Sequence, residues 1–242
     1  TIGALGIPIA FNNHITGRNL QQSHEICSFA DPYIGQDAGY LQVTRLKGNG
    51  PALVVVPENK TPFEAYQLLN EPMRPAQTFE GTFAWMAHSQ AYAENEWKGV
   101  EQWNAPTSAT LAPNASRTYG VRFLVSDEIR NIEKTLAANN RPVAVGIPGY
   151  VLPQDIEGKL FLNAKSKVAS ITSEPAGALT IREDKSASKN WRAYNLRGNT
   201  WGRARLLVKY ADGNQQSISY YVIKPSAQAV ADLGNFLFTK QW

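Results

Sequence analysis

Apolar and polar residues alternate along two segments in the first half of the chain. In the first, one face of an extended chain carries Phe79, Phe83 and Trp85. In the second, one face carries Tyr119, Val121, Phe123 and Val125. Successive strand side chains point to opposite faces, so both patterns predict strands with one buried side, over residues 78–85 and 118–125. We expect Phe79, Phe83, Trp85, Tyr119, Val121 and Phe123 to form the packed centre of a first β-sandwich.

Further strands are predicted on either side of a glycine-rich connection. Residues 40–46 and 52–56 flank Gly48-Asn49-Gly50, a pattern typical of a hairpin. Pro57 is expected to stop the second strand because proline has no backbone N–H donor. The remaining segments of this half predict short strands with loops over 1–38, helical turns or a covering loop over 61–70, and a short strand over 108–111.

A short helix is predicted directly after the second alternating segment. Ser126 and the two acidic residues that follow it are typical of a helix start, where a hydroxyl caps free N–H groups and negative charge is favoured. The apolar residues at helical spacing are Ile129, Ile132 and Leu136. The helix separates two strand-rich regions, so we predict a first β-sandwich over 1–125 and a linker helix over 126–140.

The second region predicts an immunoglobulin-like sandwich, because short strands alternate with turn residues. The predicted strands are 143–147, 160–162, 168–171, 178–181, 204–210 and 217–223. Asp212-Gly213 supplies the residues that a tight hairpin turn needs. This Ig-like domain is predicted to cover 141–224, which makes the whole chain all-β.

The last segment, 225–242, has the pattern of a helix. Val230, Leu233 and Leu237 recur at helical spacing, and Phe236, Phe238 and Trp242 follow among the final residues. Such an apolar end has nothing in the chain to pack on, so we expect it to lead into a following domain.

Composition favours an extracellular, strand-rich protein. Of 242 residues, only 18% are charged, while Asn, Gln, Ser, Thr and Gly are plentiful. Asn59 and Asn114 begin glycosylation sequons, which agrees with secretion. No apolar run approaches the roughly 20 residues of a membrane helix, so no membrane partner is expected.

Positive charge is concentrated in one segment. Residues 182–209 carry eight Lys or Arg against Glu183 and Asp184, a net +6, and the remainder of the chain is therefore −2. Trp191, Tyr194 and Trp201 lie among these cations, as in polyanion binders. Cations that alternate with apolar residues are also typical of the wet face of a sheet, which we favour. Binding of an acidic polysaccharide or of nucleic acid by this segment is the alternative, although nucleic acid is not among the partners that we expect.

No motif for a metal, a nucleotide or a catalytic nucleophile is present, so no cofactor, metal or catalytic residue is predicted. The polar and aromatic stretch 86–103 is the place where a ligand is expected. Aromatic rings stack on the C–H faces of sugars, and neighbouring polar groups bind hydroxyls. The predicted substrate-binding residues are His88, Tyr92, Glu94, Glu96, Trp97 and Trp103. Glu94 and Glu96 would share one face of a strand, although we favour a solvated strand edge or loop for them. Trp85 is expected in the core.

Several of these pieces together resemble a known family. They are the 79–85 strand, the approach from Trp103 to Leu111, the Leu111-Ala112-Pro113-Asn114 turn into Tyr119-Gly120-Val121-Arg122-Phe123, and the helix closing with Lys240-Gln241-Trp242. The pattern resembles the non-catalytic β region of secreted, mostly fungal six-hairpin-glycosidase-like proteins.

The resemblance implies a mutarotase-like (super)sandwich followed by an Ig-like module. It also implies a parent glycoside hydrolase whose catalytic residues lie in a following α/α-toroid, with polysaccharide or oligosaccharide as partner. The 86–103 stretch would then shape the substrate cleft. A free-standing carbohydrate-binding module and a structural adhesion module without catalysis are the alternatives.

Overall fold

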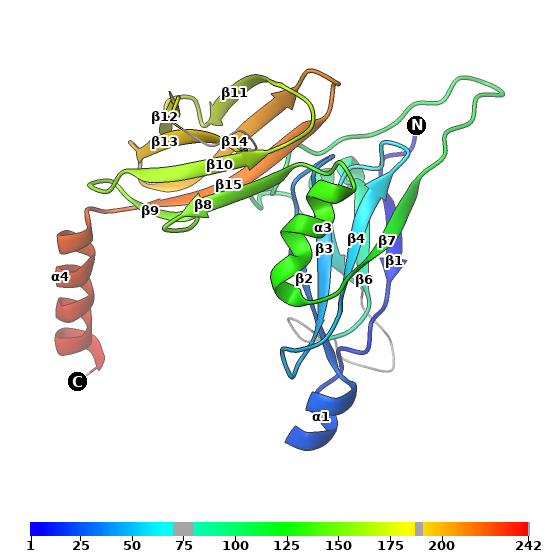
Figure 1. The fold of residues 1–242 in the computed structure, drawn as a ribbon, viewed down its shortest axis with the longest axis horizontal. Helices are drawn as coiled ribbons and strands as arrows, with labels where there is room; N and C mark the ends of the chain where they lie inside the picture. The colour runs from blue at the N-terminus through cyan, green and yellow to red at the C-terminus, as the bar shows by residue number, and fades with distance from the viewer. Residues whose placement is uncertain (70–79, 187–190, 242) are drawn as a thin grey trace. The chain divides into compact units, whose positions relative to one another are not determined.

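The computed structural model of the chain describes residues 1–69, 80–186 and 191–241. The chain divides into two compact units, Thr1–Asn139 and Asn140–Trp242, which we call the first unit and the second unit. Both are built mainly from antiparallel strands, which confirms the all-β prediction, and Figure 1 shows their elements.

The first unit contains two sheets. A three-stranded sheet has the order β1-β6-β5, and a four-stranded sheet has the order β2-β3-β4-β7. The strand bounds are β1 Leu5–Ile9, β2 Ser28–Tyr33, β3 Tyr40–Arg45, β4 Ala52–Glu58, β5 Ala65–Leu68, β6 Phe83–His88 and β7 Gly120–Ser126. The predicted hairpin of 40–46 with 52–56 is confirmed as the antiparallel pair β3–β4.

Trp85 lies at the centre of this unit, as its alternation predicts. It is fully buried, its ring stacks on Phe63 with 3.8 Å between ring centroids, and its Nε1 donates a hydrogen bond of 3.0 Å to the Pro62 carbonyl oxygen. Leu41 and Val55 pack in the same cluster from the four-stranded sheet. The core of the first unit therefore lies between the two sheets.

The prediction that Phe123 belongs to this core is wrong. The β4–β7 register places Phe123 opposite Val55 and Val125 opposite Leu53, so both lie on the face that alternation assigns to them. However, β7 is an edge strand, and the side chains are 53% and 69% exposed. Val121 is the residue of this pattern that packs against the core cluster. Phe79 lies outside the described residues.

Helix α3 (Ile132–Ala138) follows a short 3-10 turn, Ile129–Asn131, and belongs to the first unit. Ile132 and Leu136 are buried, and the Thr135 hydroxyl donates a hydrogen bond of 3.1 Å to the Ser126 hydroxyl. The helix predicted after Ser126 is confirmed. Ser126 itself does not cap the helix but donates to the Glu128 carbonyl oxygen at 2.8 Å.

Strand β5 occupies a segment where helical turns or a loop were predicted. Tyr66 of β5 stacks on Phe83 of β6 with 4.6 Å between ring centroids, and such cross-strand aromatic pairs stabilise a sheet. Pro57 does not stop β4, which continues to Glu58. Since β3 pairs only with Leu53–Val55, one side of β4 is unpaired there, and proline removes no ladder bond.

Two smaller predictions for the first unit are also corrected. Within 1–38 the chain forms helix α1 (Leu20–Ile26), not only strands and loops, because Asn19 and Gln22 form a reciprocal capping box. Residues 108–111 do not form a strand. Ala109 makes an isolated bridge with Ile2 instead.

The second unit is a two-sheet sandwich, as the Ig-like prediction requires. Its sheets have the orders β12-β13-β10-β8 and β11-β14-β15-β9. The bounds are β8 Val143–Ile147, β9 Val151–Pro153, β10 Gly158–Asn163, β11 Val168–Glu174, β12 Leu179–Asp184, β13 Arg192–Gly198, β14 Gly202–Tyr210 and β15 Gln215–Ile223. The turn at Asp212-Gly213 joins β14 to β15, with Gly213 at φ +83° where glycine is favoured.

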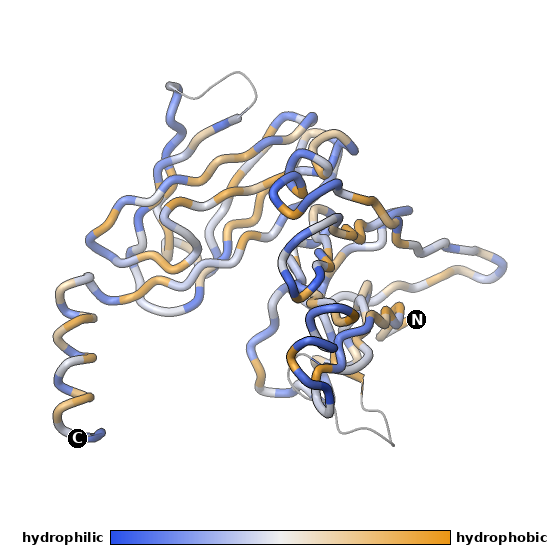
Figure 2. The backbone as a smooth tube through the Cα atoms, turned by 60° about the horizontal axis from the view of Figure 1, so that its bottom comes forward, coloured by the Kyte–Doolittle hydropathy of each residue, from blue (hydrophilic) through white to orange (hydrophobic). Residues whose placement is uncertain are grey.

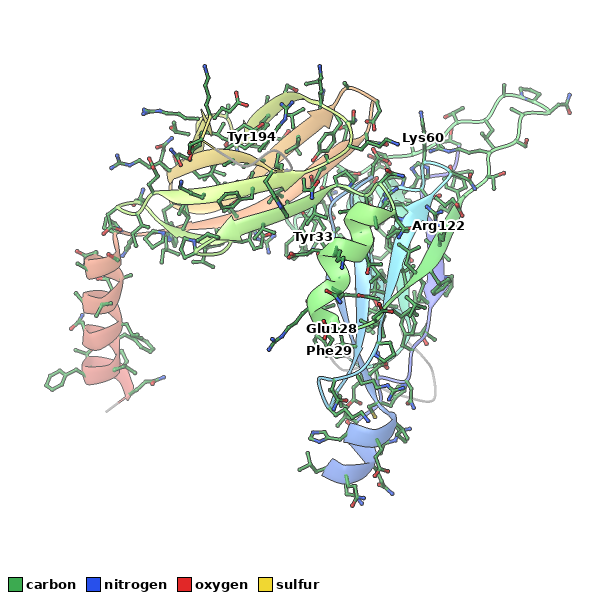
Figure 3. All side chains as sticks on the ribbon, in the orientation of Figure 1. Phe29, Tyr33, Lys60, Arg122, Glu128 and Tyr194 are labelled. Carbon is green, nitrogen blue, oxygen red and sulfur yellow. The ribbon has the colours of Figure 1, made fainter. Side chains whose placement is uncertain are left out.

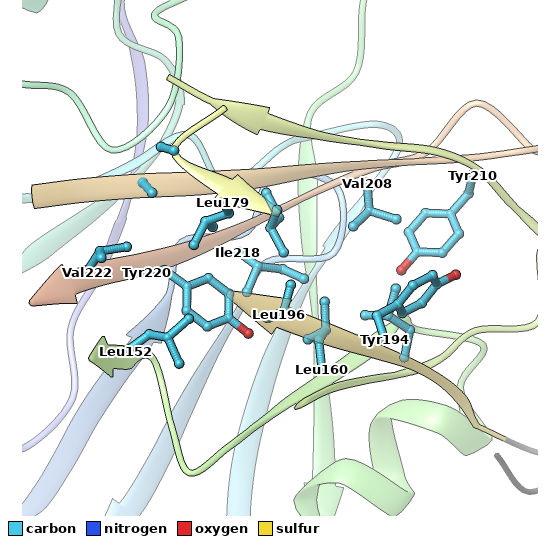
Figure 4. Close-up of a cluster of buried hydrophobic side chains, with 14 residues drawn as sticks. Leu152, Leu160, Leu179, Tyr194, Leu196, Val208, Tyr210, Ile218, Tyr220 and Val222 are labelled. Carbon is cyan, nitrogen blue, oxygen red and sulfur yellow. The ribbon is translucent and has the colours of Figure 1, made fainter. Parts of the chain in front are cut away.

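One continuous apolar cluster fills this sandwich. Leu160 and Leu196 contribute from one sheet, Leu206 and Ile218 from the other, and each is at most 1% exposed. Figure 4 shows Leu160, Leu196 and Ile218 meeting between the two sheets together with Tyr194, Tyr210 and Tyr220. The hydrophobic alternation of these strands therefore has a direct structural cause, a face shared with the opposite sheet.

Helix α4 (Ser226–Phe236) continues as a π-helical turn over Leu237–Gln241. None of its side chains is buried, and Val230 and Leu233 are 71% and 57% exposed. Figure 2 shows hydrophobic positions recurring along this helix. The predicted helix is thus present and carries an uncovered apolar side within the described part of the chain.

Candidate functional site

The stretch 86–103, predicted as an irregular ligand-binding connection, contains regular structure. Met86 and His88 belong to β6, and helix α2 (Gln90–Glu94) follows directly. Glu94 is therefore the last residue of a helix and Glu96 lies in the turn after it, so they do not share the face of a strand. Glu94 accepts a hydrogen bond of 2.6 Å from Gln90, and both carboxylates are exposed.

Tyr92 and Trp97 serve mainly to pack this segment. Their rings stack with 4.8 Å between centroids, and both contact the buried cluster of Ala65, Ala84 and Met86. The aromatic face that either ring could offer to a sugar is thus partly occupied by the protein itself.

Trp103 is placed differently, because 47% of its surface is exposed. The residue after it, Asn104, is 3% exposed and donates hydrogen bonds to the carbonyl oxygens of Glu64 at 3.0 Å and Ile34 at 3.2 Å. The exposed indole is therefore attached to an anchored backbone. A ring held in this way loses little conformational entropy when a ligand stacks on it.

A buried carboxylate holds both ends of the segment that contains Trp103. Glu64 is 1% exposed, and its Oε1 accepts hydrogen bonds from the backbone N–H groups of Ser89 at 2.8 Å and Thr107 at 2.9 Å. The hydroxyl of Ser89 donates to Oε1 and that of Thr107 donates to Oε2. Four donors thus converge on one carboxylate, which ties the start of α2 to the loop at Thr107.

The chain of hydrogen bonds continues from Thr107 to the surface. His88 Nδ1 lies 2.8 Å from Thr107 Oγ1, and His88 Nε2 lies 2.8 Å from the Tyr119 hydroxyl. Because the Thr107 hydroxyl donates to the carboxylate, it accepts from His88, which places the imidazole proton on Nδ1. Nε2 then accepts from Tyr119, so all donors in the chain point towards Glu64.

The environment shifts the titration of two members of this chain. Burial raises the pKa of the Glu64 carboxyl, and the hydrogen bonds from Ser89 and Thr107 oppose that rise. Burial lowers the pKa of the His88 imidazole, and the positive charge of Arg117 lowers it further. Arg117 also lies over the Tyr119 ring, with 4.7 Å from its guanidinium carbon to the ring centroid.

This network is able to hold a loop and to pass a proton between a buried carboxyl and a half-exposed phenol. His88 is 3% exposed, so its imidazole is shielded from solvent. The predicted role of His88 as a direct ligand of substrate would therefore have to act through Tyr119. Since each member has partners within the chain, the arrangement is suited to positioning the 104–119 loop.

The two sequon asparagines lie on the surface of the first unit. Asn59 and Asn114 are both exposed and have positive φ angles of 52° and 65°. Lys60, which follows Asn59, is labelled in Figure 3 on the same side of the unit as Arg122. Both amide groups are thus accessible in the folded chain.

Two features are absent from the described ranges, 1–69, 80–186 and 191–241. These ranges contain no group of three or more His, Cys, Asp or Glu side chains placed to hold a metal ion. They also contain no helix that combines the length and the apolar character needed to cross a bilayer.

Sequence reasoning missed Glu64, Asn104 and Thr107. They are separated by up to 43 residues along the chain, and no local pattern joins them. The only available signal was an acidic residue, Glu64, between two apolar neighbours that prove buried, Phe63 and Ala65. A carboxylate at such a place has to find donors inside the protein.

Comparison with known proteins gives a family and a fold. A family model described as "Family of unknown function (DUF5695)" matches residues 1–242. No curated protein matches the chain. A solved structure of a polysaccharide lyase superposes with a TM-score of 0.70 at 13% sequence identity. The similarity covers 98% of this chain and 32% of the lyase, so the chain spans about a third of the length of that protein.

The likeness to the polysaccharide lyase concerns the fold, since the two sequences share few residues. It shows that this chain has the β-sandwich architecture of part of that lyase. The six-hairpin-glycosidase family, which the sequence pattern resembles, is not what these comparisons identify.

Proposed function

This chain belongs to the DUF5695 family of unknown function, and we propose that it is the β-sandwich region of a larger polysaccharide-processing enzyme. The observation that carries the proposal is the fold similarity over 98% of the chain to only 32% of a polysaccharide lyase. A region of that kind supports and orients a substrate while another part of the protein performs the chemistry.

The arrangement of titratable groups supports catalysis elsewhere. Glu64 and His88 are at most 3% exposed and have partners within the chain. Glu94 and Glu96 lie on the exposed surface, at the end of α2 and in the turn after it. We therefore assign no catalytic residue to this chain.

Helix α4 supports the presence of a following domain. Its exposed apolar residues are Val230, Leu233, Phe236, Leu237 and Phe238. An exposed apolar patch of this kind marks an interaction surface. In this proposal the apolar surface of α4 packs against a further domain of the parent protein. The sequence resemblance implies that this domain is an α/α-toroid.

Trp103 supports a direct contact with polysaccharide. It combines an exposed aromatic face with a backbone held by Asn104 and, through the adjoining loop, by Glu64. Exposed Glu94 and Glu96 lie in the same stretch of chain and can accept hydrogen bonds from sugar hydroxyls. In this proposal the segment forms one wall of the substrate cleft.

The reaction and the location belong to the same proposal. Exposed Asn59 and Asn114 support a secreted, glycosylated parent.

Two types of reaction are open to the parent. The resemblance in sequence supports glycoside hydrolysis and the structural likeness supports elimination. The parent chain, incubated with a uronate-containing polysaccharide, separates them: elimination forms a product with a conjugated double bond that absorbs ultraviolet light, and hydrolysis forms only reducing ends.

The first test compares residues 1–242 with the parent enzyme. The isolated chain is expected to bind polysaccharide but to release no product, whereas the parent releases it. Robust cleavage by residues 1–242 alone would overturn the assignment of catalysis to another domain. Binding without a catalytic parent would instead identify a free-standing carbohydrate-binding module.

The second test addresses Trp103. Retention on insoluble polysaccharides is measured for the wild-type chain, Trp103→Ala and Val100→Ala. Stacking of one aromatic ring contributes about 1 kcal/mol, so about a fivefold weaker retention is expected for Trp103→Ala. Val100 is 64% exposed in the same segment and serves as the matched control. Equal retention of all three chains would remove Trp103 from the proposed cleft.

A further inference from the structure

The second unit carries a polar groove on the outer side of its β12–β13 pair. The groove has a volume of about 530 Å³ and is lined by residues of β12, of β13 and of the connection between β9 and β10. Its lining includes Arg182, Arg197 and Glu157, with Thr180, Asn195 and Asn199 between them. All of these residues belong to the second unit, whereas Trp103 belongs to the first.

Strand register explains why these polar residues gather. Arg182 pairs with Asn195, and Thr180 pairs with Arg197. Directly paired residues project from the same face of a sheet. The residues between them, Ile181 and Leu196, point into the sandwich, where Leu196 is 1% exposed. The two arginines therefore stand two residues apart on neighbouring strands of the outer face.

The basic segment predicted from the sequence is divided by the structure. Tyr194 is a core residue, and Arg205 of β14 forms an ion pair of 3.2 Å with Glu174. Lys159 of β10 forms an ion pair of 3.0 Å with Asp184 beside the groove. Figure 3 shows nitrogen-tipped side chains projecting from this part of the unit, around the labelled Tyr194. The cationic face thus has some partners already within the protein.

Arg182 and Arg197, the two cations that line the groove, form no ion pair with a described residue. Both are exposed, and among the described residues neither lies within ion-pair distance of a carboxylate. The buried side-chain oxygen of Asn195, in the wall between them, also has no hydrogen-bond partner in the described chain. Unpartnered polar groups of this kind are satisfied by water or by a ligand.

The composition of the groove defines the ligand. Two guanidinium groups bind carboxylate or sulfate oxygens through paired N–H donors. Glu157 and the carboxamides accept and donate hydrogen bonds as sugar hydroxyls require. Among the described residues no aromatic side chain lines the groove, and Glu157 would repel a continuous run of phosphates. These features favour a hydroxyl-rich anion over a nucleic acid, which is bound through stacked bases and many cations.

We propose that the groove on the outer face of β12 and β13 binds an acidic saccharide, with Arg182 and Arg197 contacting its carboxylate or sulfate groups. That the ligand is a saccharide rests on the proposed function. The groove is a second binding surface, separate from the Trp103 segment, and it gives the protein a preference for charged over neutral glycan chains.

Affinity electrophoresis and calorimetry with residues 1–242 test the proposal at low salt. The probes are polygalacturonate for carboxylate groups, dextran sulfate for sulfate groups, neutral dextran, and single-stranded DNA. The variants are Arg182→Gln/Arg197→Gln and, as a matched control that removes the same charge, Lys209→Gln/Lys240→Gln. All four side chains are exposed, so the folds are expected to remain intact, which thermal unfolding checks.

The arginine variant is expected to bind at least one acidic glycan about tenfold or more weakly, because each charge-assisted hydrogen bond contributes substantially. The lysine control is expected to change affinity less than about threefold. Binding of only one acidic probe identifies carboxylate or sulfate as the recognised group and supports the proposal.

Three results would overturn the groove assignment: equal loss in both variants, no binding of either acidic glycan, or tighter binding of DNA than of both glycans. The first two leave the proposed function standing if wild-type retention on neutral polysaccharide still depends on Trp103. Conversely, arginine-dependent binding of an acidic glycan supports the groove even if the parent protein proves to cleave no polysaccharide, which would overturn the proposed function alone.

Discussion

The interiors of the two units are held together by different interactions. The second unit has one apolar cluster between two four-stranded sheets, with Leu160, Leu206 and Ile218 fully buried. The first unit combines a smaller apolar core around Trp85 with a buried carboxylate, Glu64, and a buried imidazole, His88. An apolar core tolerates changes that preserve volume, whereas a buried polar network depends on each partner. The first unit should therefore be the more sensitive to polar substitutions and to pH.

The largest expected effect is the loss of apolar volume in the second unit. Leu206→Ala is expected to lower the free energy of unfolding by about 2–5 kcal/mol, because it removes a fully buried side chain and leaves a cavity. Hydrogen exchange resolved by peptide is the measurement, with faster exchange expected in β10–β15. Val230→Ala, at a position 71% exposed, is the control and should change stability by less than about 0.5 kcal/mol.

The next effect is the removal of the carboxylate in the first unit. Glu64→Leu leaves four donors without their acceptor and is expected to destabilise the unit by about 3 kcal/mol. Glu64→Gln keeps the shape and one acceptor oxygen, so a smaller loss is expected. Urea unfolding of the three chains measures both. A Leu variant as stable as wild type would show that Glu64 is not the anchor of this segment.

A smaller effect is expected at the surface end of the network. Tyr119→Phe removes the hydrogen bond to His88 and should cost about 1 kcal/mol of stability. Tyr221→Phe in the second unit changes a hydroxyl that is part of no such chain and should cost less. Thermal unfolding compares the two, and equal losses would contradict a specific role for the Tyr119 hydroxyl.

The smallest expected effect is a dependence of stability on pH that arises in the first unit. The pKa of Glu64 is raised on folding from its ordinary value of 4.5, so its contribution to stability is full below that value and is lost as pH rises through the folded pKa. The pKa of His88 is lowered from 6.5, so its contribution is present above 6.5 and is lost as pH falls through the folded pKa. The two effects oppose each other.

Comparison of variants separates them. The difference in unfolding free energy between wild type and Glu64→Gln should decrease as pH rises above 4.5. The apolar cluster of the second unit contains no carboxyl or imidazole group, so exchange in β10–β15 should follow only the intrinsic dependence on pH. A difference that stays constant over this range would show that Glu64 titrates normally in the folded chain.

The same contrast decides what sequence patterns were able to predict. Alternation correctly predicted most strands of the second unit because its two sheets bury one face each. It missed β13 (Arg192–Gly198), whose outward residues include Asn195 and Arg197 and whose pattern therefore reads as polar. In the first unit alternation placed Phe123 on the correct face of its strand. It did not predict that Phe123 is exposed, because burial also depends on whether the strand lies at the edge of its sheet.

The candidate site shows a similar limit. The sequence indicated the 86–103 stretch and Trp103, since aromatic and polar residues gather there. It did not indicate that Tyr92 and Trp97 stack on each other. It also did not indicate that Glu64 accepts a hydrogen bond from Thr107, which lies 43 residues further along the chain. Contacts of that kind depend on the sheet that brings β5, β6 and the loop together, and no local period encodes them.

The exposed turn at Asn114 offers a practical use. Residues 110–118 are all exposed, and Asn114 has a φ of 65° at the turn where the Ala115 N–H donates to the Ala112 carbonyl oxygen. Both flanks are held: Ala109 pairs with Ile2, and β7 pairs with β4. A peptide tag or a fluorophore inserted after Asn114 should therefore leave the sandwich intact, and it would give a reporter a short distance along the chain from Trp103.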